Sequence, residues 1–179
     1  VLAVCAVQLY NHLGHNCTII SNKKERKELL LKAGAFNFLS LDEAEASNHK
    51  HDYSLFLSSS WEYWYCCMKL SKRFGNIAVL GFPGRNSEPC QNPLKPEWTY
   101  AKQLRIEFCG TVEEHQDSRE RSKSAESLNM SRLVNLIDRS ILDANLIVTD
   151  VIAERELKNI YERLRKRSCT DNTFILNWQ

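Results

Sequence analysis

Residues 17–41 read CTIISNKKERKELLLKAGAFNFLSL, and this stretch decides the fold that we predict. The β-branched run Thr18–Ile20 is typical of a short buried strand. A helical pattern follows from Lys24 to Lys32, and Gly34 is a residue type that commonly ends a helix. The apolar run at 36–41 then predicts a second strand. A strand, a helix and a strand in so short a stretch indicate one unit of an α/β protein.

The rest of the chain continues this alternation. We expect further helices at 1–13, 61–75, 128–141 and 153–167, and further strands at 53–58, 76–81, 104–110, 146–152 and 173–178. We expect residues 42–51 to form a polar connector, 82–96 a long loop, and 111–124 an exposed charged segment. The pattern predicts a parallel sheet wrapped by helices on both faces. We expect the strands at 18–20, 54–57, 77–80 and 105–108 to be neighbours in that sheet.

Composition limits the classes of partner. The chain has 179 residues, 26% of them charged, and a net charge of only +2, which argues against nucleic acid or an anionic membrane as the main partner. None of the seven cysteines forms a C-x-x-C pair, and no histidine pair has metal-ligand spacing. Free cysteines in apolar runs indicate the reducing cytoplasm. No apolar run is long enough to span a membrane.

Ligands of open parallel sheets bind at the carboxyl ends of the strands. The residues that follow the predicted strands are therefore the first candidates for a binding site. These residues lie at 21–24, 58–60, 81–85 and 109–111, and they are rich in serine, glycine and basic side chains.

Several segments, in the right order, resemble one known family. The segments are AVQLYNHLG (6–14), the strand and helix of residues 17–41, YSLFLSSS (53–60), FGNIAVLGFPGR (74–85) and YAKQLRIEFCGT (100–111). They resemble the nucleotide-binding half of the medium-chain dehydrogenases/reductases, the zinc-type alcohol dehydrogenase superfamily. The resemblance covers essentially the full chain. It implies a Rossmann-type doubly wound parallel sheet with its first strand missing. Residues 1–151 would form the incomplete dinucleotide-binding domain, and 152–179 a closing helix and strand that in the family pack toward the catalytic domain.

The family's glycine-rich turn is almost absent. Of the pattern G-x-G-x-x-G/A, only the last position is present, as Ala3, and the first strand and two leading glycines would precede Val1. The resemblance implies that a catalytic domain with the proton relay, and with zinc if the protein binds it, would also precede this chain. We therefore expect no catalytic and no metal-ligating residue here, and no activity of this chain alone.

The end of the second family strand selects the cofactor. An acidic residue there accepts a hydrogen bond from the ribose 2′-hydroxyl of NAD, whereas a 2′-phosphate requires donors and positive charge. Ser21 occupies this position, and Asn22, Lys23, Lys24 and Arg26 follow. This pattern favours NADP over NAD. The alternative interpretation is a solvated first turn of a helix, although cations are mildly unfavourable there.

The resemblance implies a cofactor-binding role for residues after each strand. The predicted set is Ala3, Ser21, Asn22, Lys23, Lys24, Arg26, Ser58, Ser59, Ser60, Gly81, Phe82, Pro83 and Gly84. The implied activity is hydride transfer between a nicotinamide cofactor, NADP or NAD, and a small alcohol or carbonyl substrate in a longer protein, and a homo-oligomer is compatible with it.

Two other functions are weighed against this one. A degenerate Rossmann module would bind a partner or regulate without catalysis. A methyltransferase would need an acid after its second strand, and Ser21 argues against it.

We interpret the S-x-x-K match at 21–24 as chance, Cys66–Cys67 as packing, and the aromatic cluster at 61–65 as core rather than an adenine platform.

Overall fold

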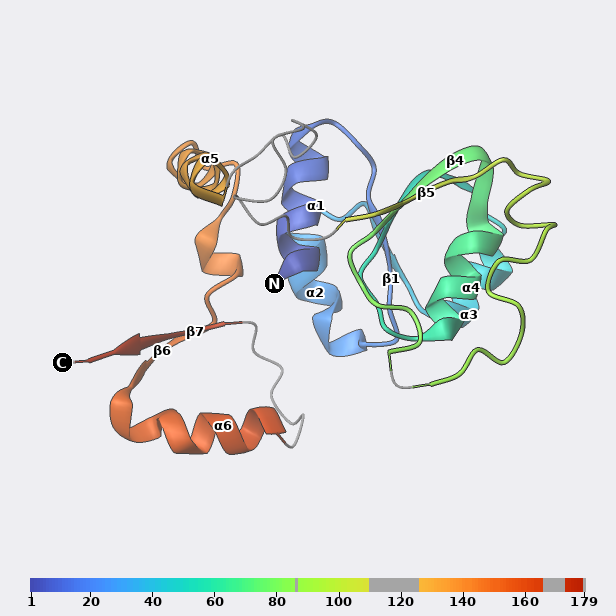
Figure 1. Cartoon of the computed structure of the whole chain (residues 1–179). Helices are drawn as coiled ribbons and strands as arrows, with labels where there is room; N and C mark the ends of the chain where they lie inside the picture. The colour runs from blue at the N-terminus through green and yellow to red at the C-terminus, as the bar shows by residue number, and fades with distance from the viewer. Residues whose placement is uncertain (86, 110–125, 166–172, 179) are drawn as a thin grey trace. The chain divides into compact units, whose positions relative to one another are not determined.

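The computed structural model describes residues 1–85, 87–109, 126–165 and 173–178 (Figure 1). The chain divides into two compact units. Unit 1 comprises residues 1–38 and 123–179, and unit 2 comprises residues 39–122. The division that the sequence predicts at residue 151 stays a prediction.

Unit 1 begins with helix α1 (Leu2–His12), strand β1 (Thr18–Ile20), a 3-10 turn η1 (Lys24–Arg26), helix α2 (Lys27–Lys32) and strand β2 (Asn37–Leu39). Gly14 and Gly34 end α1 and α2 with φ of 79° and 105°, in the left-handed region that glycine adopts readily. Both helix ends were predicted from the sequence, and so were β1 and β2.

The later part of unit 1 contains helix α5 (Glu126–Asp138), a 3-10 turn η2 (Ala144–Leu146) and strand β6 (Asp150–Ala153). A 3-10 turn η3 (Glu154–Glu156), helix α6 (Leu157–Arg165) and strand β7 (Phe174–Asn177) follow. Strands β6 and β7 pair in parallel, from Asp150↔Phe174 to Ala153↔Asn177. The predicted strand–helix–strand order at the end of the chain is confirmed.

Unit 2 contains helix α3 (Leu41–Ser47), strand β3 (His51–Phe56), helix α4 (Trp61–Leu70), strand β4 (Ser71–Val79) and strand β5 (Arg105–Phe108). The three strands form one sheet in the order β3-β4-β5, and both pairs are parallel. Figure 1 shows α3 and α4 together on one side of this sheet. The predicted parallel α/β fold is confirmed.

Each unit has its own apolar core. In unit 1, Val4 and Val7 of α1 pack with Leu30 of α2 and Phe38 of β2. In unit 2, the core joins one face of the sheet to α4, and its buried members are Phe56, Trp64, Tyr65, Met68, Ile77 and Val79. The aromatic cluster therefore belongs to the core, as the sequence predicted.

Three sequence-based predictions were wrong. Residues 42–51 are no connector, because α3 occupies 41–47. Helix α4 ends at Leu70, and residues 71–75 already belong to β4. Strand β1 is paired with β2 in a two-stranded sheet, whereas we expected it in one sheet with the strands at 54–57, 77–80 and 105–108. With three residues each, β1 and β2 specify their neighbours weakly. The charged segment 111–124 lies outside the described residues.

Candidate cofactor-binding loops

Residues Ser21–Arg26, which we call the basic loop, join β1 to α2 in unit 1. The Ser21 hydroxyl accepts a hydrogen bond from the Lys23 backbone N–H at 3.2 Å, and the Arg26 N–H donates to the Lys23 carbonyl at 3.0 Å. These bonds fold the loop into a turn on which Lys23 and Lys24 are exposed. Neither lysine has an ion pair among the described residues. The loop therefore offers two solvent-facing cations directly after a strand.

The basic loop follows a strand that shares a core with α1. Ile19 of β1 and Ala3 of α1 both pack against the apolar cluster that contains Val4 and Leu30. The first turn of α1 has no side-chain cap and no acidic residue. The amino end of a helix carries the positive end of its dipole, which favours an anion there. Ala3 lies in this first turn and is half-buried.

In unit 2, the structure brings together the residues that follow β3 and β4. We call residues 57–60 and 81–84 the strand-end loops. The Gly81 N–H donates to the Phe56 carbonyl at 2.9 Å, and the Gly84 N–H donates to the Ser59 carbonyl at 2.9 Å. The sequence predicted this juxtaposition because parallel strands end at one edge of their sheet.

The two glycines of these loops are needed by the protein's own packing. A Cβ on Gly81 would collide with the backbone carbonyl of Ser58, and a Cβ on Gly84 would collide with the indole of Trp61. That indole also donates from Nε1 to the Ser87 carbonyl at 2.8 Å. The loops thus close tightly on each other. Phe82 is 69% exposed, and Pro83 lies half-buried beside it.

The serines of the first strand-end loop organise backbone. The Ser58 hydroxyl accepts from the Ser60 N–H at 3.1 Å, and the Ser60 hydroxyl caps α4 by accepting from the Glu62 N–H at 3.2 Å. Both hydroxyls keep a proton to donate, and Ser59 is exposed. Thr111, which belonged to the predicted fourth loop, lies outside the described residues, whereas Cys109 is exposed after β5.

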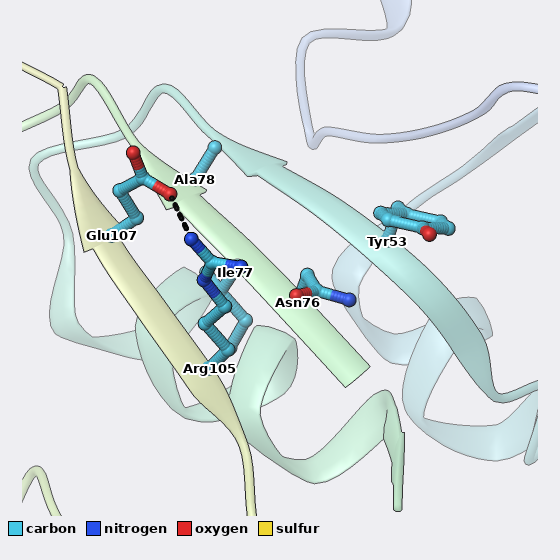
Figure 2. A pocket seen from close by; sticks show the side chains of 6 residues that line it. All are labelled: Tyr53, Asn76, Ile77, Ala78, Arg105 and Glu107. Carbon is cyan, nitrogen blue, oxygen red and sulfur yellow. Dashed lines mark hydrogen bonds and ion pairs between the residues drawn. The ribbon is translucent and has the colours of Figure 1, made fainter. Parts of the chain in front are cut away.

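A shallow pocket lies on the face of the sheet that α4 does not cover (Figure 2). Tyr53, Asn76 and Arg105 come from registered positions of the three strands, and the Arg105 guanidinium approaches Glu107 at 3.5 Å. Sequence reasoning missed this pocket, since alternation shows which residues share a face but not whether another element covers it. None of the predicted site residues lines it.

The cysteines of α4 do not form a reactive centre. Burial raises the pKa of the Cys66 thiol to about 11, and burial likewise raises the pKa of Cys67 to about 11. Both are therefore protonated and poorly nucleophilic at neutral pH.

Among the described residues, no group of three or more His, Cys, Asp or Glu side chains is placed to hold a metal ion. No helix within the described ranges is both long and apolar enough to cross a bilayer.

No protein-family model matches this chain, and no curated protein matches it either. Solved structures do match it. An alcohol dehydrogenase from Pyrobaculum aerophilum matches with a TM-score of 0.68 and 19% identity over 97% of this chain and 45% of that chain. A putative zinc-binding dehydrogenase from Clostridium scindens matches with a TM-score of 0.71 and 20% identity, over 96% of this chain and 46% of that chain.

The fold is that of one half of an alcohol dehydrogenase chain. A third match, a short chain alcohol dehydrogenase from E. coli solved with the cofactor NADH, has a TM-score of 0.71 and 13% identity over 98% of this chain and 49% of that chain. This chain thus spans about half the length of the dehydrogenases that it matches. The matches confirm the fold that the resemblance in sequence implied. At sequence identities this low, a match shows a shared fold and nothing about function.

Proposed function

We propose that this chain is the nucleotide-binding part of an oxidoreductase that transfers a hydride between a nicotinamide cofactor, preferably NADP, and an alcohol or carbonyl substrate. The observation that carries the proposal is the basic loop, which follows β1, together with the start of α1, because Ile19 of β1 and Ala3 of α1 pack in the same core. Dinucleotides bind at these two places in folds of this type. The nicotinamide supplies the hydride chemistry, and the protein binds and orients it.

The chemistry of the basic loop fits a phosphate. Ser21 stands where a carboxylate would select NAD, and it introduces no negative charge that would repel a 2′-phosphate. Lys23 and Lys24 are exposed cations with free donors, and Arg26 adds a guanidinium to the same turn. Ser21, Lys23, Lys24 and Arg26 would hold the 2′-phosphate, and the N–H groups of the first turn of α1 would face the pyrophosphate.

Titration of both cofactors against the full-length protein, or against this chain extended to restore its first strand, tests the proposal. We expect NADPH to bind more tightly than NADH by about tenfold to a few hundredfold, which corresponds to roughly 1.4–3 kcal/mol, because exposed charge-assisted contacts are weakened by screening. Ser21→Asp should reverse the preference, since the carboxylate can accept from a ribose hydroxyl and repels a phosphate. Lys24→Ala should weaken NADPH and leave NADH nearly unchanged.

The matched control is Lys158→Ala, which removes another exposed lysine charge, on α6. It should change neither affinity, and raising the salt concentration should narrow the gap between the two cofactors. Equal affinities in the unaltered full-length or extended protein, or a Ser21→Asp variant that still prefers NADPH, would contradict the proposed NADP preference. In that case the basic residues of the loop would be only the solvent-exposed first turn of a helix, with no ligand.

The second candidate is a degenerate module with a non-catalytic binding or regulatory role. The closure of the strand-end loops favours it, because Ser58 and Ser60 bond to local backbone and Trp61 packs over Gly84. Such a module would bind neither cofactor, even in a protein extended to restore a preceding strand. Measurable affinity for either nicotinamide cofactor would therefore exclude this candidate.

A further inference from the structure

Two lysines converge on the carboxyl end of α4. The Lys102 ammonium donates to the carbonyls of Met68 and Lys69 at 2.7 and 2.8 Å. The Lys50 ammonium donates to the same Lys69 carbonyl at 3.1 Å. One carbonyl oxygen thus brings two like charges together, and the negative end of the helix dipole offsets part of their repulsion.

Neither ammonium is neutralised by a carboxylate. Lys50 and Lys102 take part in no ion pair among the described residues. Each ammonium has three N–H donors, so both keep donors that the carbonyls do not use. Burial lowers the pKa of Lys102, and the charge of Lys50 lowers it further, as expected for two cations that share one acceptor.

The surroundings are basic as well. Lys69 pairs with Glu45 at 3.1 Å and Lys72 pairs with Asp52 at 2.7 Å, so the nearby carboxylates are already matched by their own lysines. Burial lowers the pKa of His51, and the charges of His49 and Lys72 lower it further. Lys50 and Lys102 are therefore an excess of positive charge at this end of unit 2.

We propose that Lys50 and Lys102 form a site for the phosphoryl group of a small molecule. A phosphate dianion bridging the two ammoniums would accept their free donors and remove their mutual repulsion. Lys50 precedes β3 and Lys102 precedes β5, so this phosphoryl site lies at the amino ends of parallel strands. The strand-end loops lie at the carboxyl ends of β3 and β4. Within unit 2, the site is thus distinct from the strand-end loops.

Chemical protection tests the site residue by residue. The full chain is acetylated with an amine-reactive ester in inorganic phosphate, or in sodium chloride of equal ionic strength, and each lysine is quantified by mass spectrometry. We expect phosphate to slow the acetylation of Lys50 and Lys102 about threefold or more, and to leave Lys158 unchanged. In Lys50→Gln, half-protection of Lys102 should need about tenfold more phosphate. Lys24→Gln, in the basic loop, should leave the protection of Lys102 unchanged.

The form of the ligand is tested in a second arm with glycerol phosphate as a phosphate monoester. Protection by the monoester at lower concentration than by inorganic phosphate would identify a phosphorylated metabolite as the class of ligand, and the reverse would identify free phosphate. Equal protection by chloride, or an unchanged response in Lys50→Gln, would overturn the site. Lys50→Arg, which keeps the charge, should retain protection of Lys102. Lys50 is exposed and gives only one backbone hydrogen bond, so its substitution should not unfold the chain.

Discussion

At the scale of single residues, the strand-end loops show why serine and glycine occur at the carboxyl edge of the three-stranded sheet. The sequence showed only that small and polar residues follow two predicted strands. The structure adds the reason for Gly81: a side chain there would meet the backbone of residues 57 and 58, which cannot move without breaking the bonds from Leu80 and Gly81 to Phe56. Packing between loops is long-range, so no local pattern could have predicted it.

Gly81→Ala should therefore be clearly destabilising. We expect a loss of about 2 kcal/mol or more in the free energy of unfolding, because the added methyl group meets rigid backbone. Gly14→Ala is the control: its φ of 79° strains any other residue by about 1 kcal/mol, but the space around it is open. Urea denaturation followed by circular dichroism measures both. A cost of Gly81→Ala below that of Gly14→Ala would show that the loops separate easily.

At the scale of elements, α3 and α4 show where sequence reasoning failed. The start signal of α3 was present in the sequence, as Ser40 followed by Glu43 three residues later, but the polar composition of 42–51 concealed it. Its one fully buried side chain, Ala44, gives almost no apolar periodicity. The end of α4 had no such signal. Lys50 and Lys102 donate to its last carbonyls, and both come from other parts of the chain.

Ser40→Ala should destabilise α3. The Ser40 hydroxyl accepts from the Glu43 N–H at 3.2 Å, and the Glu43 carboxylate accepts from the Ser40 N–H at 2.7 Å, so both halves of the capping box are formed. Losing the hydroxyl should cost about 1 kcal/mol. Ser40→Asp restores an N-cap acceptor and should recover most of the loss. Amide exchange in residues 41–47 measures the effect locally, and unchanged exchange in Ser40→Ala would contradict a stabilising cap.

At the scale of the whole molecule, strand and helix order was predictable because alternating apolar runs and helical patterns are local properties of the sequence. The parallel pairing of β3, β4 and β5 followed from that order, since a helix or a long loop separates each pair. The partner of β1 did not follow, because a three-residue strand carries too little pattern to specify a neighbour. The same limit applies to the phosphoryl site, whose lysines are 52 positions apart in the sequence but share one carbonyl oxygen.

The two cores should respond separately to mutation. Leu30 is 5% exposed in the core of unit 1, and Ile77 is 1% exposed in the core of unit 2, and the two clusters share no member. Truncating either residue to alanine should cost about 2–5 kcal/mol through lost burial and the cavity left behind. Leu31→Ala, next to Leu30 but 39% exposed, is the control and should cost much less.

Amide hydrogen exchange on the full chain can separate these effects by region. Leu30→Ala should speed exchange in α1 and α2 more than in β4, and Ile77→Ala should speed exchange in β3 and β4 more than in α1, because each cavity opens within one cluster. Equal acceleration throughout the chain by both variants would mean that the two cores unfold as a single cooperative unit, and the division of the chain into two units would then have no energetic meaning.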